Sequence, residues 1–168
     1  MICTRLCLST WIWMPEVEDR VRFILATGTY ADGVTRRPLA GAESVADVEA
    51  FPWPDPDDLD YGRVALEARR LSAPYAVKGG WAPIFCQVTN LFGMEDGLVA
   101  LLTRPLVIEA TVAHILDFYL DVLQRVHDAC EGHLDFAPLG DDFADQRRLL
   151  VSPELWRRIF WTGLYQAV

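Results

Sequence analysis

The chain has 168 residues, of which 52% are hydrophobic and 23% are charged, a composition typical of a globular protein and not of a disordered one. Its formal net charge of −9 argues against nucleic acid as a partner, because phosphates require a basic face. No run in the sequence reaches the roughly 18 consecutive apolar residues that a membrane span needs, so we expect no membrane partner either.

Cysteine and histidine positions give no metal signature. The four cysteines are scattered, without a CxxC pair and without histidines at zinc-finger spacing. We therefore expect reduced thiols, a cytoplasmic location and no metal site, and we interpret the histidines as structural or surface residues. Residues 1–14 are apolar, but Ser9 and Thr10 interrupt them and no A-x-A cleavage pattern follows, so no signal peptide is predicted.

The first half of the chain predicts a hairpin followed by short helices. Residues 1–18 match no pattern, and residues 21–25 and 34–39 predict two strands around a turn with Gly28 and Asp32-Gly33. Ser44 is the expected N-cap of a helix over residues 45–50. The proline-rich connector from Phe51 leads into a second helix over residues 59–71, whose first turn is acidic.

The second half alternates between buried strands and helices. Residues 75–77 predict a strand that ends at Gly79-Gly80, and residues 134–139 predict another that ends at Gly140. Between them we expect helices from residue 83, over 94–102 and over 105–130, the last with a broad apolar stripe. Ser152 and Pro153 open a final helix over 153–161. This βαβ order predicts an α/β fold with a parallel sheet.

Polar residues follow the second predicted strand. Asp141, Asp142 and Gln146 lie just beyond its end and before a helix, which is the usual position of an α/β active site. Two adjacent carboxylates raise one another's pKa, as a proton donor or an acceptor of N–H groups requires. The alternative is a solvated turn in which Asp141 and Asp142 pair with Arg147 or Arg148.

Several motifs occur together in a recognisable order. They are FPWPDPDD from Phe51, GGWAP from Gly79, NLFGMED from Asn90 and G-D-D-x-x-x-Q from Gly140, the last followed by S-P-E at Ser152. In this the chain resembles the uroporphyrinogen decarboxylase-like superfamily. The resemblance implies a TIM barrel fold, here an incomplete (β/α)8 barrel over residues 19–168 with a preceding β-hairpin, while residues 1–18 stay unplaced.

The resemblance also implies an activity and further site residues. Decarboxylases of this family remove acetate side chains of a porphyrinogen without a cofactor, using a proton donor and arginines that hold carboxylates. It makes Asp141 and Asp142 the expected catalytic residues, and Gln146, Trp81 and Thr89 the expected substrate-binding ones. Thr89 stands where orthodox members carry a tyrosine, Asp142 stands where they carry a serine, and the family's N-terminal arginine motif is not recognisable. We therefore expect a fragment that is inactive alone.

Two alternatives remain open. The chain could be a fragment of a corrinoid-dependent methyltransferase of the same superfamily, a branch that binds zinc through a H-x-C and a distant cysteine, neither recognisable here. It could also be a non-catalytic chain that is stabilised by association with a partner or with a second copy, because an open parallel sheet leaves edges and apolar faces uncovered.

Overall fold

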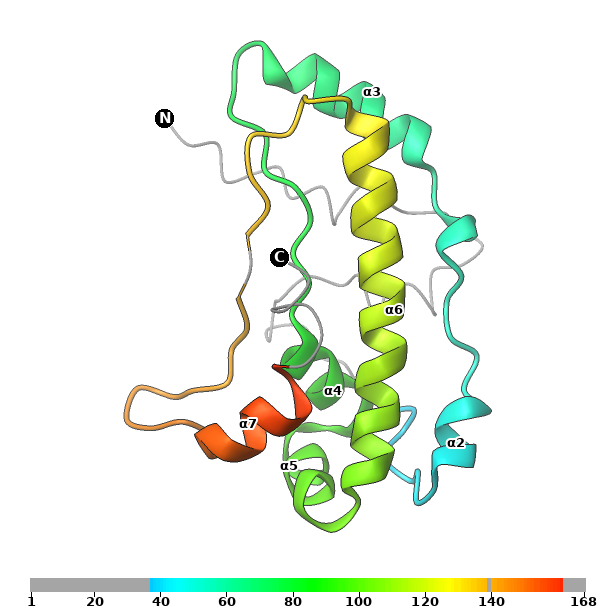
Figure 1. Cartoon of the computed structure of the whole chain (residues 1–168), viewed down its shortest axis with the longest axis vertical. Helices are drawn as coiled ribbons and strands as arrows, with labels where there is room; N and C mark the ends of the chain where they lie inside the picture. Colours follow the sequence, from blue (N-terminus) through cyan, green and yellow to red (C-terminus); the bar gives the residue numbers. More distant parts are fainter. Residues whose placement is uncertain (1–36, 139, 162–168) are drawn as a thin grey trace. The chain divides into compact units, whose positions relative to one another are not determined.

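The computed structural model describes residues 37–138 and 140–161 (Figure 1). These residues form six α-helices and one 3₁₀ helix, and the described part of the chain contains no sheet. The predicted α/β fold, a partial (β/α)8 TIM barrel with a preceding β-hairpin, is therefore wrong for this part of the chain. Of the hairpin itself, residues 21–36 lie outside the described residues, and residues 38–41 form a turn.

The two predicted strands meet, but only as one isolated parallel bridge between Lys78 and Phe136. Gly79 donates its N–H to the Phe136 carbonyl at 2.7 Å, and Asp135 donates to the Val77 carbonyl at 2.9 Å. Pairing is short because Pro138 lacks an N–H and Asp135 uses its side chain to accept the Val77 N–H. A parallel pair is also weak without further strands on both sides, so extended segments form here in place of a sheet.

The chain divides into two compact units. The helix α6 (Pro105–Cys130) belongs to both, because residues 118–130 lie in the first unit and residues 105–117 in the second. The first unit comprises, among the described residues, 54–82, 118–138 and 140. It contains η3 (Pro56–Asp58) and α3 (Tyr61–Ser72), which Asp60 caps by accepting the Arg63 N–H at 2.9 Å. The apolar side of α3 is buried through Val64, Ala68 and Leu71.

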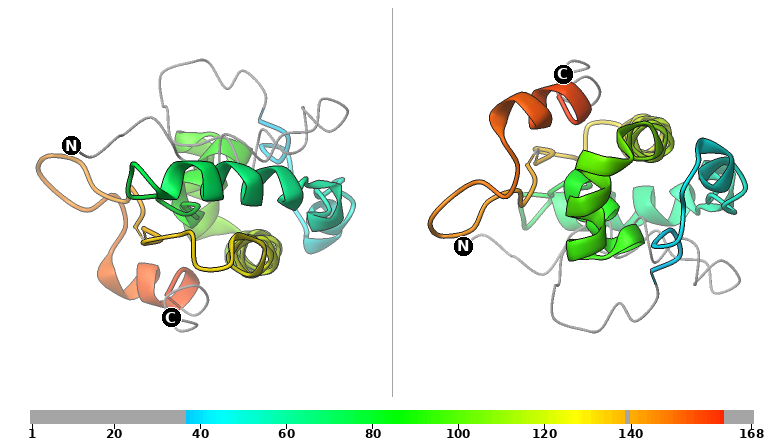
Figure 2. Two further views of the ribbon diagram at one scale, coloured as in Figure 1. Left: turned by 90° about the horizontal axis from the view of Figure 1, so that it is seen from above. Right: turned by 90° about the horizontal axis from the view of Figure 1, so that it is seen from below.

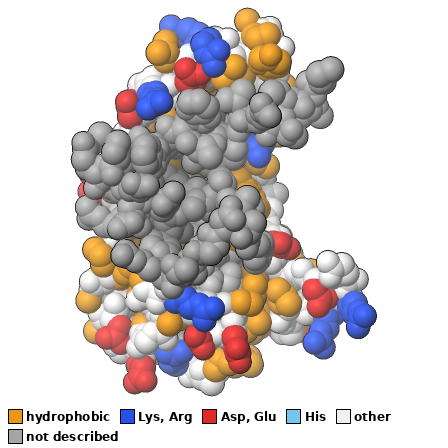
Figure 3. Space-filling view, turned by 180° about the vertical axis from the view of Figure 1, so that it is seen from behind, with side chains coloured by type: hydrophobic (Ala, Val, Ile, Leu, Met, Phe, Trp, Pro, Cys, Tyr) orange, Lys and Arg blue, Asp and Glu red, His pale blue; other side chains and the backbone are white. Residues whose placement is uncertain are grey.

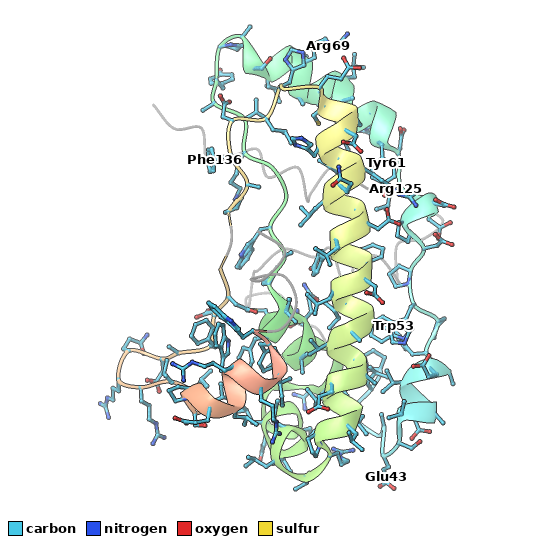
Figure 4. All side chains as sticks on the ribbon, in the orientation of Figure 1. Glu43, Trp53, Tyr61, Arg69, Arg125 and Phe136 are labelled. Carbon is cyan, nitrogen blue, oxygen red and sulfur yellow. The ribbon has the colours of Figure 1, made fainter. Side chains whose placement is uncertain are left out.

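A polar cluster holds the start of α3 and the end of η3 against α6 in this unit. Arg125 donates two hydrogen bonds to Asp121, at 2.6 and 2.8 Å, and forms an ion pair with Asp57. Its guanidinium also lies 5.7 Å from the ring centroid of Tyr61, toward which it points in Figure 4. The Tyr61 hydroxyl donates to the Pro56 carbonyl at 2.8 Å. These contacts join η3, α3 and the second half of α6 without a sheet.

The second unit comprises residues 37–53, 83–117 and 141–161 of the described chain. Its helices are α2 (Val45–Glu49), α4 (Ile84–Phe92), α5 (Met94–Thr103), the first half of α6, and α7 (Pro153–Ile159). α4 and α5 pack side by side, and every residue of α4 except Asn90 is buried. α4 is therefore the core helix of this unit, because it is buried on all sides.

α6 runs without interruption, and Figure 2 views it nearly along its axis.

Local capping signals explain why the helices follow the sequence so closely. Ser44 accepts the Asp47 N–H, and the Asp47 carboxylate accepts the Ser44 N–H at 2.9 Å, which completes a capping box on α2. Ser152 accepts the Leu155 N–H at 3.2 Å at the start of α7. The predicted bounds of α6 agree with the structure at both ends. These helix predictions are confirmed.

An aromatic group holds the connector after α2 against α6. Trp53 stacks on His114 with the ring centroids 4.7 Å apart and the planes 9° from parallel, and Figure 4 shows Trp53 beside α6. The Trp53 indole N–H donates to the Val48 carbonyl at 2.9 Å, and His114 lies 3.2 Å from the Glu49 carboxylate. This histidine therefore has a structural role, as the sequence predicted.

Candidate functional site

Asp141 lies at the N-terminus of α4. Its carboxylate accepts the backbone N–H groups of Phe85 and Cys86, the latter at 3.1 Å, and the N–H of Asp142 at 2.9 Å. α4 has no cap of its own, because the residue at the cap position is Pro83. The positive end of the helix dipole favours a carboxylate at this place. A residue more than fifty positions away thus caps the core helix of the second unit.

Burial sets the protonation behaviour of this carboxylate. Removal from water raises the pKa of Asp141, and the amide donors and the Cys86 thiol oppose that shift without cancelling it. The sequence predicted the raised pKa but attributed it to repulsion from Asp142, whereas desolvation is the main cause. A carboxyl group with a raised pKa can exchange a proton closer to neutral pH than an ordinary aspartate can.

Asp142 and Gln146 are exposed, in contrast to Asp141. Gln146 lies at the tip of a short antiparallel turn closed by a bridge between Ala144 and Leu149. Asp145 organises this turn by accepting the N–H groups of both residues after Gln146, each at 2.7 Å. Neither Asp141 nor Asp142 forms an ion pair with Arg147 or Arg148 among the described residues, so the predicted alternative of a solvated, arginine-paired turn does not describe this pair.

Trp81 and Thr89, the two remaining predicted site residues, make internal hydrogen bonds. In the first unit, the Trp81 indole N–H donates to the Gly140 carbonyl at 2.7 Å. In the second unit, Thr89 is buried and its hydroxyl donates to the Cys86 carbonyl at 3.0 Å. Cys86 therefore connects Thr89 to Asp141, since its N–H donates to that carboxylate. A direct contact of Thr89 with substrate stays a prediction.

Two residues of α4, Cys86 and Gln87, were not among the predicted site residues. Cys86 contacts Asp141 through both its amide and its thiol, and Gln87 is a buried amide whose side-chain oxygen has no hydrogen-bond partner among the described residues. The first contact has no sequence signal, because Cys86 and Asp141 are distant in the chain. Gln87 could be noticed as one of the polar residues of a mostly apolar helix.

No metal-binding group and no single spanning helix occur in the part of the chain that the structure describes. Within it, no three His, Cys, Asp or Glu side chains gather closely enough to hold an ion. No single described helix is long and apolar enough to cross a membrane, while α5 and α6, bent by 117° at their junction, reach the required length and composition only as a pair.

Comparison with known proteins returns no relative. The chain matches no protein-family model, no curated protein and no solved structure at a significant level. No relative therefore indicates a function for the chain, and only its own residues do.

Proposed function

We propose that the chain carries part of the substrate site of a uroporphyrinogen decarboxylase-like enzyme. Such an enzyme removes acetate carboxyl groups from a porphyrinogen, or from a related substrate, without a cofactor. The observation that carries the proposal is the contrast between two adjacent carboxylates: Asp141 is fixed on α4, whereas Asp142 is exposed. The order of the sequence motifs around them supports the same class.

We propose different roles for the two carboxylates. Asp141 is a positioning residue, because its oxygens already accept amide N–H groups. Asp142 is the group that contacts the substrate, where an ionised carboxylate accepts the N–H groups of the pyrrole rings. In the reaction of the complete enzyme, a proton donor of that enzyme protonates the pyrrole ring and the bond between the methylene and the carboxyl carbon breaks. Its electron pair neutralises the protonated ring as carbon dioxide leaves. A proton then adds to the resulting exocyclic methylene while the ring loses one, which gives the methyl group. We propose that the chain alone binds substrate and does not turn it over.

Binding of uroporphyrin, the stable oxidised form of the substrate, tests the proposal. Its absorbance and fluorescence report binding directly, and Asp142→Ala should weaken binding at least about tenfold, the effect of losing one charged hydrogen bond. The matched control is Asp145→Ala, which removes a nearby exposed carboxylate that serves its own turn. Equal binding by the unaltered chain and Asp142→Ala, or equal loss in both variants, would contradict the proposal.

Apolar exposure favours a second candidate, a non-catalytic chain that associates with a second copy. Leu102 is 74% exposed, Leu106 is 68% exposed and Leu66 is 67% exposed, so these large apolar side chains are open to contact with a partner. Figure 3 shows apolar side chains among charged ones on the coloured surface. Light scattering at increasing concentration distinguishes the candidates, because a monomer that binds uroporphyrin excludes association as the source of stability.

A further inference from the structure

Residues 141–161, which we call the strap, are attached to α4 at their two ends. At the first end, the Asp141 carboxylate accepts the N–H groups of Phe85 and Cys86. At the second end, Phe160 is only 1% exposed and packs edge-on against Phe85, with ring centroids 5.6 Å apart and planes at 77°. Both attachments therefore lie on the first turn of the same helix.

Between its ends the strap combines local contacts with one ion pair to α6, in which Arg158 lies 3.8 Å from Glu109. Val151 is the one buried residue between positions 142 and 158 of the described chain. The backbone bonds of Leu150 to Phe143, at 2.9 Å, and of Asp145 to Arg148, at 2.9 Å, stay inside the strap. The ring of Trp156 likewise contacts Phe143 within the strap, with centroids 5.1 Å apart. A segment with few buried tertiary contacts opens at a lower free energy than the core does.

We propose that the strap opens as a unit from α4 while the rest of the protein stays folded, and that Asp141 is its latch. Opening releases the carboxylate from the α4 amides and uncovers the first turn of the helix, where Cys86 is 6% exposed in the closed state. The internal bonds of the strap persist on opening, whereas the contacts of Asp141 with α4, the packing of Phe160 on Phe85 and the ion pair of Arg158 with Glu109 are broken.

The rate of thiol labelling measures this opening. Two single-cysteine chains are needed: one keeps Cys86, the other keeps Cys130, and serine replaces the remaining cysteines in each. Cys130 is 1% exposed and lies in the first unit, so it reports opening of that unit or of the whole chain. With excess N-ethylmaleimide and low urea, Cys86 should label faster than Cys130 and with a shallower dependence on urea, because opening of the strap exposes less surface.

Variants at both ends of the strap identify the latch. Asp141→Ala should accelerate labelling of Cys86 at least about tenfold, because it removes a shared acceptor of buried amide groups. Labelling of Cys130 should accelerate only to the extent that the variant lowers the free energy of global unfolding. Since Asp141 also contacts the Cys86 thiol, Phe160→Leu provides a second variant, at the other end of the strap, where the ring packs on Phe85. It should accelerate Cys86 too. Asp142→Ala is the matched control and should change neither rate.

Three results would overturn the proposal. Equal labelling rates and equal urea dependence of the two cysteines in the unaltered chains would mean that Cys86 is reached through global unfolding. No acceleration of Cys86 by Asp141→Ala would mean that this carboxylate does not hold the strap closed. No acceleration of Cys86 by Phe160→Leu would mean that the two ends of the strap do not open together.

Discussion

The carboxylate of Asp141 accepts the backbone N–H of Cys86 at 3.1 Å, although 55 residues separate the two in the chain. Asp141→Ala leaves this N–H and that of Phe85 without their acceptor at the start of a buried helix. We expect the variant to lose about 1 to 3 kcal/mol of unfolding free energy in urea denaturation. Asp141→Asn keeps an acceptor oxygen and should lose less. Equal stability of the Ala variant and the unaltered chain would contradict this capping role.

The pH dependence of stability provides a second prediction for the same residue. Burial raises the pKa of Asp141 in the folded chain. A carboxyl group of this kind contributes stability below its unfolded pKa, and the contribution is lost as the pH rises through the folded pKa. Asp141→Asn cannot ionise, so its stability relative to the unaltered chain should rise as the pH increases from about 4, near the unfolded pKa of an aspartate, toward neutrality. Urea denaturation across this range measures the difference, and a trend of the opposite sign would mean that the hydrogen bonds outweigh burial.

Helices could be predicted from the sequence because their signals are local. Ser44 and Ser152 mark helix starts within three residues of the amide groups that they cap, and Pro105 and Gly93 separate neighbouring helices. Strands could not be predicted in this way. The apolar run over residues 134–139 has the composition of a buried strand, but a sheet needs partners from elsewhere in the chain. In the described part of this run, residues 134–138, the one bridge joins Phe136 to Lys78.

The candidate site likewise combines features that have a local sequence signal with features that depend on residues distant in the chain. The motif around Gly140 predicted Asp141 and Asp142, and the structure shows that the first caps α4 while the second is exposed. The partners of Asp141 were not predictable, because backbone amide groups carry no sequence signature and Cys86 is far away in the chain. Thr89 was expected to face a pocket, yet a threonine in a helix can also donate to the carbonyl three residues earlier, as it does here.

Tyr61 should make the first unit sensitive to alkali. Burial raises the pKa of Tyr61 to about 12, mainly against the opposing charge of Arg125. The fold therefore favours the neutral phenol, and its contribution to stability is lost as the pH rises through the folded pKa. Tyr61→Phe should remove this loss between about pH 10 and pH 12, at the expense of about 1 kcal/mol for the hydrogen bond to Pro56 at neutral pH. Tyr75→Phe, at a more exposed tyrosine, is the control.

The stack of Trp53 on His114 should contribute measurably to the second unit. Aromatic pairs of this geometry are worth about 0.5 to 1.5 kcal/mol beyond the area that they bury. A double-mutant cycle with Trp53→Leu and His114→Ala should therefore show a coupling free energy in this range. The same cycle for His114 and Glu49 should give about 0 to 1 kcal/mol, because the Glu49 carboxylate is exposed to solvent. A zero coupling in the first cycle would mean that the rings only lie near one another.

Two glycines next to each other in space should respond to alanine in opposite directions. Gly93 joins α4 to α5 at φ 92° and ψ 150°, a conformation that only glycine adopts readily, so Gly93→Ala should destabilise the chain by about 1 to 3 kcal/mol. Gly97 lies inside α5, where a Cβ would make ordinary contacts, the nearest at 3.5 Å from Phe92. Gly97→Ala should therefore stabilise the chain by about 0.5 to 1 kcal/mol. Urea midpoints measure both, and a loss on Gly97→Ala with tolerance of Gly93→Ala would contradict the backbone assignment at this junction.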